Sequence, residues 1–394
     1  MRVRLLDLSE QYRALSAEIR SATDEVLSSQ RFILGPKLAE FEKAMAAYCE
    51  TPHAIGVSSG TDALLAVLMA LEIGIGDAVL TTAYSFFATG GCIARVGATP
   101  VFIDIEPDTY NISATALRRY IEKECHIIEG KLASHDRQRV VALVPAHLFG
   151  VCCDMTEMLA VAREHNLVLI EDAAQAIGAE YPTANGSGRA GTIGDVGCFS
   201  FYPSKNLGAA GDAGLVICRN EQFAEKLRQC RHHGMGAQYR HDFVGGNFRL
   251  DEIQAAILNV KLPHLDGWSA ARREAASFYT AELQRIGLEK KVKLPVEPYA
   301  GTGLTNHHIY HQYVIRTERR DELRQHLTDR EIDTAIYYPL ALHEQPCFEY
   351  LGYKPGDFPE AERAARENLA LPVYPEIPRE AQQYVVNCIA EFFG

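Results

Sequence analysis

Two carboxylates follow an apolar run in the middle of the chain. Leu167 to Ile170 are four aliphatic residues in a row, which is typical of a buried strand, and Glu171 and Asp172 come directly after them. In open α/β sheets, ligands bind beyond the carboxyl ends of the strands. Asp172 is therefore well placed to pair with a cationic ring nitrogen, although the same carboxylate would also suit the N-cap of a following helix.

A lysine lies in the turn that follows a second predicted strand. Aromatic side chains recur in the segment 199–202, and the chain then runs through Lys205 into a stretch with glycines at 208, 211 and 214. Burial lowers the pKa of a lysine ammonium and makes the neutral amine available as a nucleophile. Lys205 therefore suits a Schiff-base role, whereas most lysines taken singly are solvated surface residues.

The segment 58–64, Ser-Ser-Gly-Thr-Asp-Ala-Leu, has the composition of a helix start. Small residues at Gly60 and Thr61 would let backbone N–H groups approach a phosphate, and the positive end of the helix dipole favours an anion. The same residues would also form an ordinary helix cap. No Walker A motif is present, and residues 74–76 lack the third glycine of a dinucleotide-binding fingerprint.

An aromatic residue completes the set. Tyr84 comes just after a strand predicted at 77–82, where its ring could stack on a planar molecule or pack in the core. Along the chain the order is then a phosphate cradle, a stacking ring, an acid for a ring nitrogen and a lysine. Pyridoxal 5′-phosphate needs all four of these groups. The four motifs together therefore predict a pyridoxal-phosphate site.

Alternating strands and helices must position these residues. Apolar runs with the character of buried strands occur at 54–57, 77–82, 100–103, 140–145 and 167–170. Helices with one apolar face are predicted at 12–29, 37–48, 61–71 and 156–165. This pattern indicates a parallel sheet covered on both faces. Two further strands, at 196–202 and 214–218, are close enough for one to run antiparallel, and the charged segment 125–139 is interpreted as an aperiodic surface insertion.

The character of the sequence changes past Arg249. Helices are predicted at 250–265, 270–286, 321–329, 358–368 and 379–393, with strands at 310–316 and 334–338 and a loop at 294–303. We expect an α/β fold with a mostly parallel, seven-stranded-type sheet sandwiched by helices in residues 1–260, which include an N-terminal helical segment. A smaller C-terminal α+β domain is expected in residues 261–394.

Composition excludes several classes of function. The formal net charge of −12 argues against a nucleic-acid partner. No run of about 18 apolar residues occurs, so no membrane span is expected. Residues 1–10 are charged and lack the apolar core of a secretory signal, and the ten cysteines are scattered without a C-x-x-C pair. These features predict reduced thiols in a cytoplasmic protein.

Several motifs resemble, in sequence and order, those of the DegT/DnrJ/EryC1/StrS family of sugar aminotransferases, which are fold-type I pyridoxal-phosphate enzymes. The matching segments are 32–36, 59–64, 147–150, 171–176, 200–208, 246–256, 337–339 and 342–343. The resemblance covers nearly the whole chain. Look-alike sugar 3-dehydrases carry histidine at the position of Lys205, so a lysine there favours transamination.

The resemblance implies a role for each matching residue. Lys205 would form the Schiff base, Asp172 would pair with the pyridine nitrogen, and Gln175 would contact the 3-oxygen of the ring. Other cofactor contacts would come from Gly60, Thr61 and Ser200 at the phosphate, from Tyr84 stacked on the ring, and from Asn247 reaching the phosphate of the neighbouring subunit in a homodimer. The nucleotide sugar would meet Tyr337, Tyr338 and His343.

The implied reaction moves an amino group onto a nucleotide-linked keto sugar. L-Glutamate is the expected donor, and pyridoxamine phosphate is the form of the cofactor between the half-reactions. The nucleotide and the position, C3 or C4, stay open, with a preference for a 3-keto sugar. The alternatives are a keto-cyclitol aminotransferase of the scyllo-inosose type and a non-catalytic sensor that binds pyridoxal phosphate or a sugar nucleotide. No metal site is expected, because His307 and His311 lie too far apart along a predicted strand edge to share zinc easily.

Overall fold

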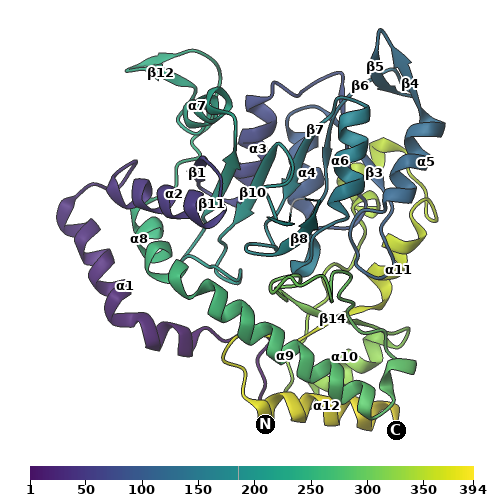
Figure 1. The fold of residues 1–394 in the computed structure, drawn as a ribbon. Helices are drawn as coiled ribbons and strands as arrows, with labels where there is room; N and C mark the ends of the chain where they lie inside the picture. The colour runs from purple at the N-terminus through teal and green to yellow at the C-terminus, as the bar shows by residue number, and fades with distance from the viewer. Residues whose placement is uncertain (185) are drawn as a thin grey trace.

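The computed structural model describes residues 1–184 and 186–394. Its centre is a sheet with helices on both sides (Figure 1). Seven strands follow one another across the sheet in the order β1, β11, β10, β7, β6, β2, β3. Their bounds are β1 His53–Val57, β2 Asp77–Thr82, β3 Thr99–Ile103, β6 Arg139–Val144, β7 Val168–Asp172, β10 Val196–Ser200 and β11 Gly214–Cys218. All neighbours from β10 to β3 are parallel, and β11 is antiparallel to both of its neighbours. The predicted α/β class and mostly parallel sheet are confirmed.

Alternate residues of each strand enter two different cores. Ile55 and Val216 pack with helices on one face, whereas Ala54 and Leu215 pack with helices on the other. The first face is covered by α3 (Gly60–Ala70), α4 (Phe87–Arg95) and α7 (Glu221–Cys230). The second is covered by α2 (Pro36–Tyr48), α5 (Ala114–Glu124), α6 (Met155–Glu164) and α8 (Glu252–Lys261). Burial on both faces explains why these strands are apolar throughout rather than alternating.

Two local expectations are wrong. The segment 125–139 is not aperiodic, because it forms a hairpin of β4 (Cys125–Ile128) and β5 (Lys131–Ser134) that joins the sheet at β6. Glu129 and Gly130, both with left-handed backbone, make the turn. The strand expected at 334–338 is a single bridge between Ala335 and Ala370. Shorter hairpins pair β8 (Glu180–Thr183) with β9 (Gly186–Arg189) and β12 (Met235–Ala237) with β13 (Arg240–His241).

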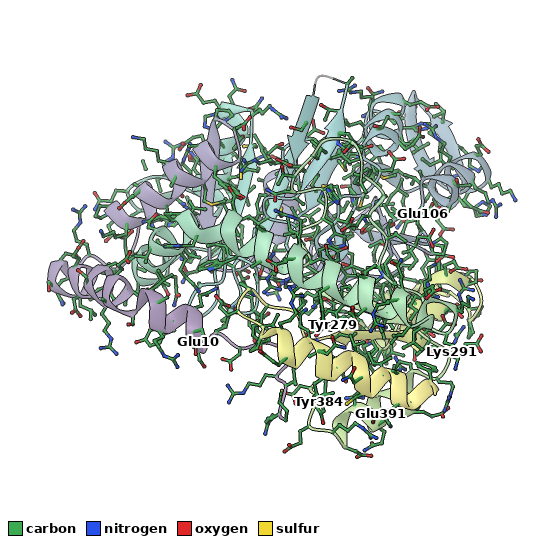
Figure 2. The ribbon with its side chains drawn as sticks, turned by 60° about the horizontal axis from the view of Figure 1, so that its bottom comes forward. Glu10, Glu106, Tyr279, Lys291, Tyr384 and Glu391 are labelled. Atoms are coloured by element: carbon green, nitrogen blue, oxygen red, sulfur yellow. The ribbon has the colours of Figure 1, made fainter. Side chains whose placement is uncertain are left out.

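The C-terminal part of the chain builds a further core. Its elements are α9 (Leu265–Arg285), β14 (Tyr313–Arg316), α10 (Arg320–Thr328), α11 (Pro359–Glu367), β15 (Asn368–Leu371) and α12 (Arg379–Phe393). Figure 2 shows α9 and α12 side by side, with Tyr279 on the first and Tyr384 on the second. Val3, which precedes α1 (Ser9–Ser29), packs in this core and pairs with Ile332. The domain division at residues 260 and 261 stays a prediction.

A cluster of buried aromatic and aliphatic side chains joins this part to the sheet beside the candidate site. Tyr84 and Phe149 from the sheet side contact Val314 and Leu342 from the C-terminal part in one buried cluster. Within the described ranges, no helix combines the length and apolarity needed to cross a membrane. All ten cysteines are free thiols, and Cys347 is the exposed one.

Candidate active site

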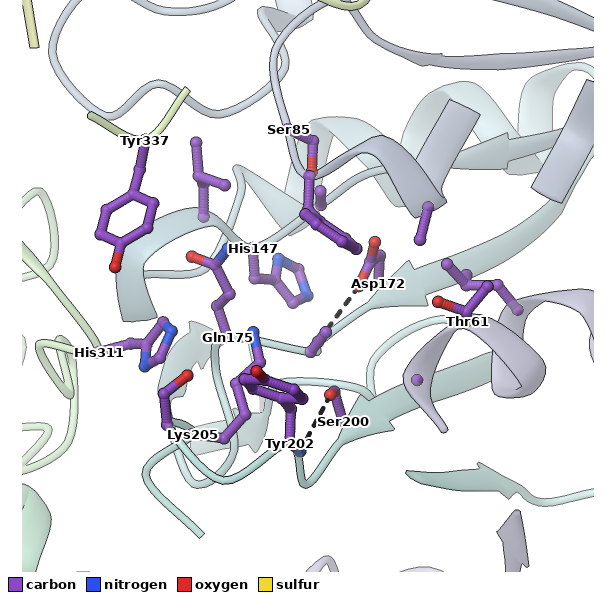
Figure 3. A pocket seen from close by; sticks show the side chains of 18 of the residues that line it. Thr61, Ser85, His147, Asp172, Gln175, Ser200, Tyr202, Lys205, His311 and Tyr337 are labelled. Carbon is purple, nitrogen blue, oxygen red and sulfur yellow. Dashed lines mark hydrogen bonds between the residues drawn. The ribbon is translucent and has the colours of Figure 1, made fainter. Parts of the chain in front are cut away.

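A cavity of about 520 Å³ opens beyond the carboxyl ends of β7 and β10 (Figure 3). Eight residues predicted from sequence line it: Gly60, Thr61, Asp172, Gln175, Ser200, Lys205, Tyr337 and Tyr338. Tyr84, Asn247 and His343 do not. The cavity therefore lies where ligands gather in parallel α/β sheets and is large enough for a cofactor-sized molecule.

The start of α3 forms one end of the cavity. Ser59 caps the helix by accepting a hydrogen bond from the backbone N–H of Asp62 at 3.0 Å. A side chain at Gly60 would place its Cβ 2.6 Å from the Cβ of Ser200, so only glycine lets the helix approach β10 this closely. Ser200 Oγ accepts from the N–H of Tyr202 at 3.3 Å, which leaves its proton for an anion. The end of β10 and the start of α3 thus offer hydroxyl and backbone N–H donors to a phosphate.

Asp172, the last residue of β7, is held by donors on both carboxylate oxygens. Thr89 Oγ1 donates to Oδ2 at 2.7 Å, and the N–H of Ala174 donates to Oδ1 at 3.2 Å. The side chain is 7% exposed, toward the cavity. A fixed, buried carboxylate of this kind stabilises a cationic ring nitrogen.

Lys205 faces the same cavity from the turn after β10. Its backbone N–H donates to the carbonyl of Tyr202 at 2.8 Å, which closes the turn. Burial lowers the pKa of Lys205 from 10.5 to about 8, and the charge of Asp172 opposes that fall. About a tenth of the amine is therefore neutral at pH 7, several hundred times more than for an ordinary lysine with a pKa of 10.5, and a nucleophilic lysine requires this neutral form.

Gln175 is oriented as a donor toward the cavity. The N–H of Phe149 donates to Gln175 Oε1 at 2.8 Å, which fixes the amide so that Nε2 points the other way. One Nε2 proton is donated to the Tyr338 hydroxyl at 3.0 Å. The second is available to an oxygen of a bound ring, as the predicted contact with the 3-oxygen requires.

Tyr84 lies elsewhere than its predicted stacking role requires. The ring is 1% exposed, and its hydroxyl accepts from the N–H of Tyr338 at 2.6 Å and from Asn368 Nδ2 at 2.8 Å. Tyr84 thus supports the Tyr337–Tyr338 segment from behind. Phe86, two residues later, is 53% exposed and lines the cavity. Both are aromatic residues of one segment, so residue type alone could not choose between them.

Two other predicted residues also lie outside this cavity. His343 is buried, with its ring 4.6 Å from that of Phe358 and Nε2 3.3 Å from Glu362 Oε1. It faces the C-terminal part of the chain and does not reach a ligand in the cavity. Asn247 is exposed on the surface, and its backbone pairs with His232.

His311 is a lining residue that the sequence reasoning considered only as a zinc ligand. Its Nδ1 bonds Asn206 Oδ1 at 3.1 Å, so this nitrogen carries the proton and Nε2 is an acceptor. Burial, with the charges of Lys205 and Arg272, keeps the pKa of His311 well below 6.5. His307 instead contacts Glu297. Asn206 could have pointed to His311, because it directly follows Lys205 in the sequence and binds both His311 and the carbonyl of Ile309.

The order of the strands, the position of the cavity and the placement of Lys205 and Asp172 on it are those of an aminotransferase. The sequence profile of the DegT/DnrJ/EryC1/StrS aminotransferase family matches residues 13–390, and the chain belongs to that family. The protein is therefore an aminotransferase.

Curated relatives match over nearly their whole length. A protein of Geobacillus stearothermophilus named pleiotropic regulatory protein is 47% identical, over 100% of this chain and 99% of that one. The dTDP-3-amino-3,4,6-trideoxy-alpha-D-glucose transaminase of Streptomyces venezuelae is 39% identical, over 99% and 96%. Among solved structures, S. venezuelae DesV in complex with a ketimine intermediate has a TM-score of 0.89 at 39% identity, covering 99% of this chain and 98% of that chain.

The pKa of Lys205 predicts its reactivity in protein stripped of any cofactor. A lowered pKa means that the neutral amine forms as pH rises through about 8, whereas an ordinary lysine needs pH near 10.5. Reductive methylation with formaldehyde and cyanoborohydride, followed residue by residue with peptide mass spectrometry, should show Lys205 reacting with a midpoint near pH 8. Lys43, an exposed lysine on α2, serves as the control. Identical pH profiles for the two lysines would contradict the burial argument.

Proposed function

We propose that this aminotransferase binds pyridoxal 5′-phosphate and transfers the amino group of L-glutamate to the keto group of a nucleotide-linked sugar. The observation that carries the proposal is the placement of Lys205 and Asp172 on one cavity whose far end is a set of phosphate donors. The 3-keto position is favoured, because the S. venezuelae relative is named for a 3-amino sugar.

The residues present fit the cofactor. A Cβ at position 60 would overlap Ser200, so glycine there keeps the space between the start of α3 and Ser200 open for a phosphate. Phe86 is placed to cover one face of the ring, Asp172 to meet its nitrogen, and Gln175 to donate to its oxygen. When bound, pyridoxal phosphate supplies an aldehyde that accepts amino groups and a cationic ring that withdraws electrons.

Lys205 does the proton work in this proposal. Its Nζ would be the nucleophile that holds the cofactor aldehyde in the resting enzyme. As a free amine, Nζ would take the proton from the donor Cα and return it at C4′ of the cofactor, and the burial that lowers the pKa of Lys205 to about 8 in the cofactor-free protein favours this basic form. In the second half-reaction Nζ moves the proton in the reverse direction, so one residue acts as base and acid.

Charge in the cavity supports a homodimer with shared sites. Of the side chains that line it, Lys205 is the one lysine or arginine, and Asp172 and Asp212 are the two acidic residues. A cofactor phosphate and a nucleotide diphosphate need more positive or amide donors than one chain provides. Asn247, exposed outside its own cavity, is proposed to meet the phosphate of the partner subunit. The cytoplasmic location stays a prediction from the cysteine content.

Direct assay of amino transfer tests the proposal. Purified enzyme reconstituted with pyridoxal phosphate would be incubated with glutamate and a panel of 3-keto and 4-keto sugar nucleotides and scyllo-inosose, with products identified by mass spectrometry. We expect a 3-amino sugar nucleotide from the native enzyme. Lys205→Ala should lower turnover by at least about a thousandfold because its proton-transferring amine is gone, while still binding pyridoxamine phosphate.

Two other outcomes of this assay would replace the proposal. Amination of scyllo-inosose alone would favour the keto-cyclitol enzyme. Cofactor binding without turnover by any donor would favour the sensor, for which the name of the G. stearothermophilus relative is the supporting observation. Near-native turnover by Lys205→Ala would remove the mechanism altogether.

Mixed dimers test the shared site. Lys205→Ala and Asn247→Asp should each inactivate their own homodimer, the second because it places a carboxylate against the phosphate. Coexpressed chains form mixed dimers in which one site of two combines native Lys205 with native Asn247. Random pairing then predicts recovery of about a quarter of native activity. No recovery in mixed dimers purified through two different tags would show that Asn247 does not act across the interface.

The stacking role of Phe86 makes a separate prediction. Phe86→Leu keeps apolar bulk but loses the aromatic face, which is worth about 0.5–1.5 kcal/mol, so the Kd for pyridoxamine phosphate should rise about 2- to 10-fold. Tyr84→Phe keeps the ring and removes the hydroxyl bonds to Tyr338 and Asn368, so it should lower the urea midpoint instead. Equilibrium dialysis measures the first effect. If Phe86→Leu leaves the Kd for pyridoxamine phosphate unchanged, Phe86 does not cover the ring of the cofactor.

A further inference from the structure

The shorter of the two hydrogen bonds that hold Asp172 comes from Thr89. Thr89 Oγ1 lies 2.7 Å from Asp172 Oδ2, and the threonine is 1% exposed. Thr89 Oγ1 also lies 3.0 Å from Ser85 Oγ, and Ser85 lines the cavity. Three side chains thus form a buried line from Ser85 through Thr89 to the carboxylate.

The direction of this line follows from proton counting. An ionised carboxylate only accepts, so the single hydroxyl proton of Thr89 is donated to Asp172. Thr89 then has only lone pairs to offer Ser85, and the proton of their shared bond comes from Ser85. Ser85 consequently fixes the direction in which the Thr89 hydroxyl points.

Thr89 is itself rigidly placed. It lies in the first turn of α4, where its N–H donates to the carbonyl of Phe86 at 3.2 Å. Further along α4, Cys92 and Ile93 are buried against the sheet. The carboxylate therefore also lies near the positive end of a helix, where an anion is favoured. The same short segment presents Phe86 to the cavity.

We propose that Thr89 is a positioning residue that holds the Asp172 carboxylate turned toward the ring nitrogen of the bound cofactor, with Ser85 orienting the Thr89 hydroxyl. The proposal rests on the pyridoxal-phosphate site proposed above. Hydrogen bonds to a charged acceptor are short and strong, and donors on both carboxylate oxygens leave little freedom to rotate. Without Thr89, Oδ2 would be free to turn toward Lys205, the cation that shares the cavity.

Thr89→Val removes the hydroxyl while keeping the shape, and Thr89→Ser keeps the hydroxyl. For Thr89→Val we expect the Kd for pyridoxamine phosphate to rise at least about tenfold, because a bond to a charged acceptor is lost. In cofactor-free protein, the midpoint pH for methylation of Lys205 should also move up, since the released carboxylate stabilises the ammonium. Thr89→Ser should restore both values to within about threefold and half a pH unit of native.

A matched control separates positioning from loss of stability. Thr81 is likewise fully buried and donates to the carbonyl of Val144 at 2.8 Å, away from the cavity. Thr81→Val removes an equivalent hydroxyl, so it should lower the urea midpoint while leaving the Kd and the Lys205 profile unchanged.

The outcomes distinguish this inference from the proposed function. If native protein fails to bind pyridoxal or pyridoxamine phosphate, the proposed function fails first. If native protein binds the cofactor and Thr89→Val matches it in Kd and in the Lys205 midpoint, Thr89 does not position Asp172. Equal losses in Thr89→Val and Thr81→Val would also overturn the inference, because they would reflect stability alone.

Discussion

The ammonium group of Lys205 and the carboxylate of Asp172 have to share one buried cavity without forming a direct ion pair. Asp172 influences Lys205 through its charge alone, and its two oxygens are occupied by Thr89 and by the N–H of Ala174. Lys205 is held in a turn closed at Tyr202. Asp172 is the last residue of β7, whereas Lys205 lies in the turn that follows the adjacent parallel strand β10, and the register of the two strands pairs Cys198 with Asp172. The space between them is what a planar ring can fill.

The acidic residue that precedes Asp172 anchors the end of β7 and does not line the cavity. Glu171 is fully buried and accepts hydrogen bonds from the backbone N–H groups of Gly191, Ile193 and Gly194 and from His147 Nε2. The N–H of Cys153 donates to His147 Nδ1 at 3.1 Å, so the imidazole carries a proton on Nε2 and donates it to Glu171. A buried carboxylate with four donors is stable and stiff. The adjacent acids thus divide the work: one fixes the strand end, and the other faces the ligand.

The sequence predicted the structure well wherever a pattern of residues is compatible with few local structures. Apolar strands between amphipathic helices gave the sheet, and one of the two late strands, β11, is antiparallel as anticipated. The direction in which a side chain points after the end of a strand could not be predicted from the sequence. Tyr84 points inward because its N–H bonds Thr82 Oγ1 and its hydroxyl meets Asn368, which is 284 residues away in sequence. His343 was likewise placed by residue type near a motif, and its burial against Phe358 depends on distant packing.

The proposed nucleotide-linked substrate is an anion, and the net charge of the protein is −12, so the overall charge of the protein does not attract it. The favourable field has to be local. The starts of α3 and α4 both open near the cavity, and Lys205 adds one cation, whereas Asp172 and Asp212 subtract from it. Helix termini act over about one turn, which is enough for a phosphate in contact with Gly60 and Thr61 but not for a nucleotide farther out. The outer charges of the proposed substrate would therefore need donors from beyond this chain's own cavity. This local shortage of cations is the physical argument for the proposed dimer.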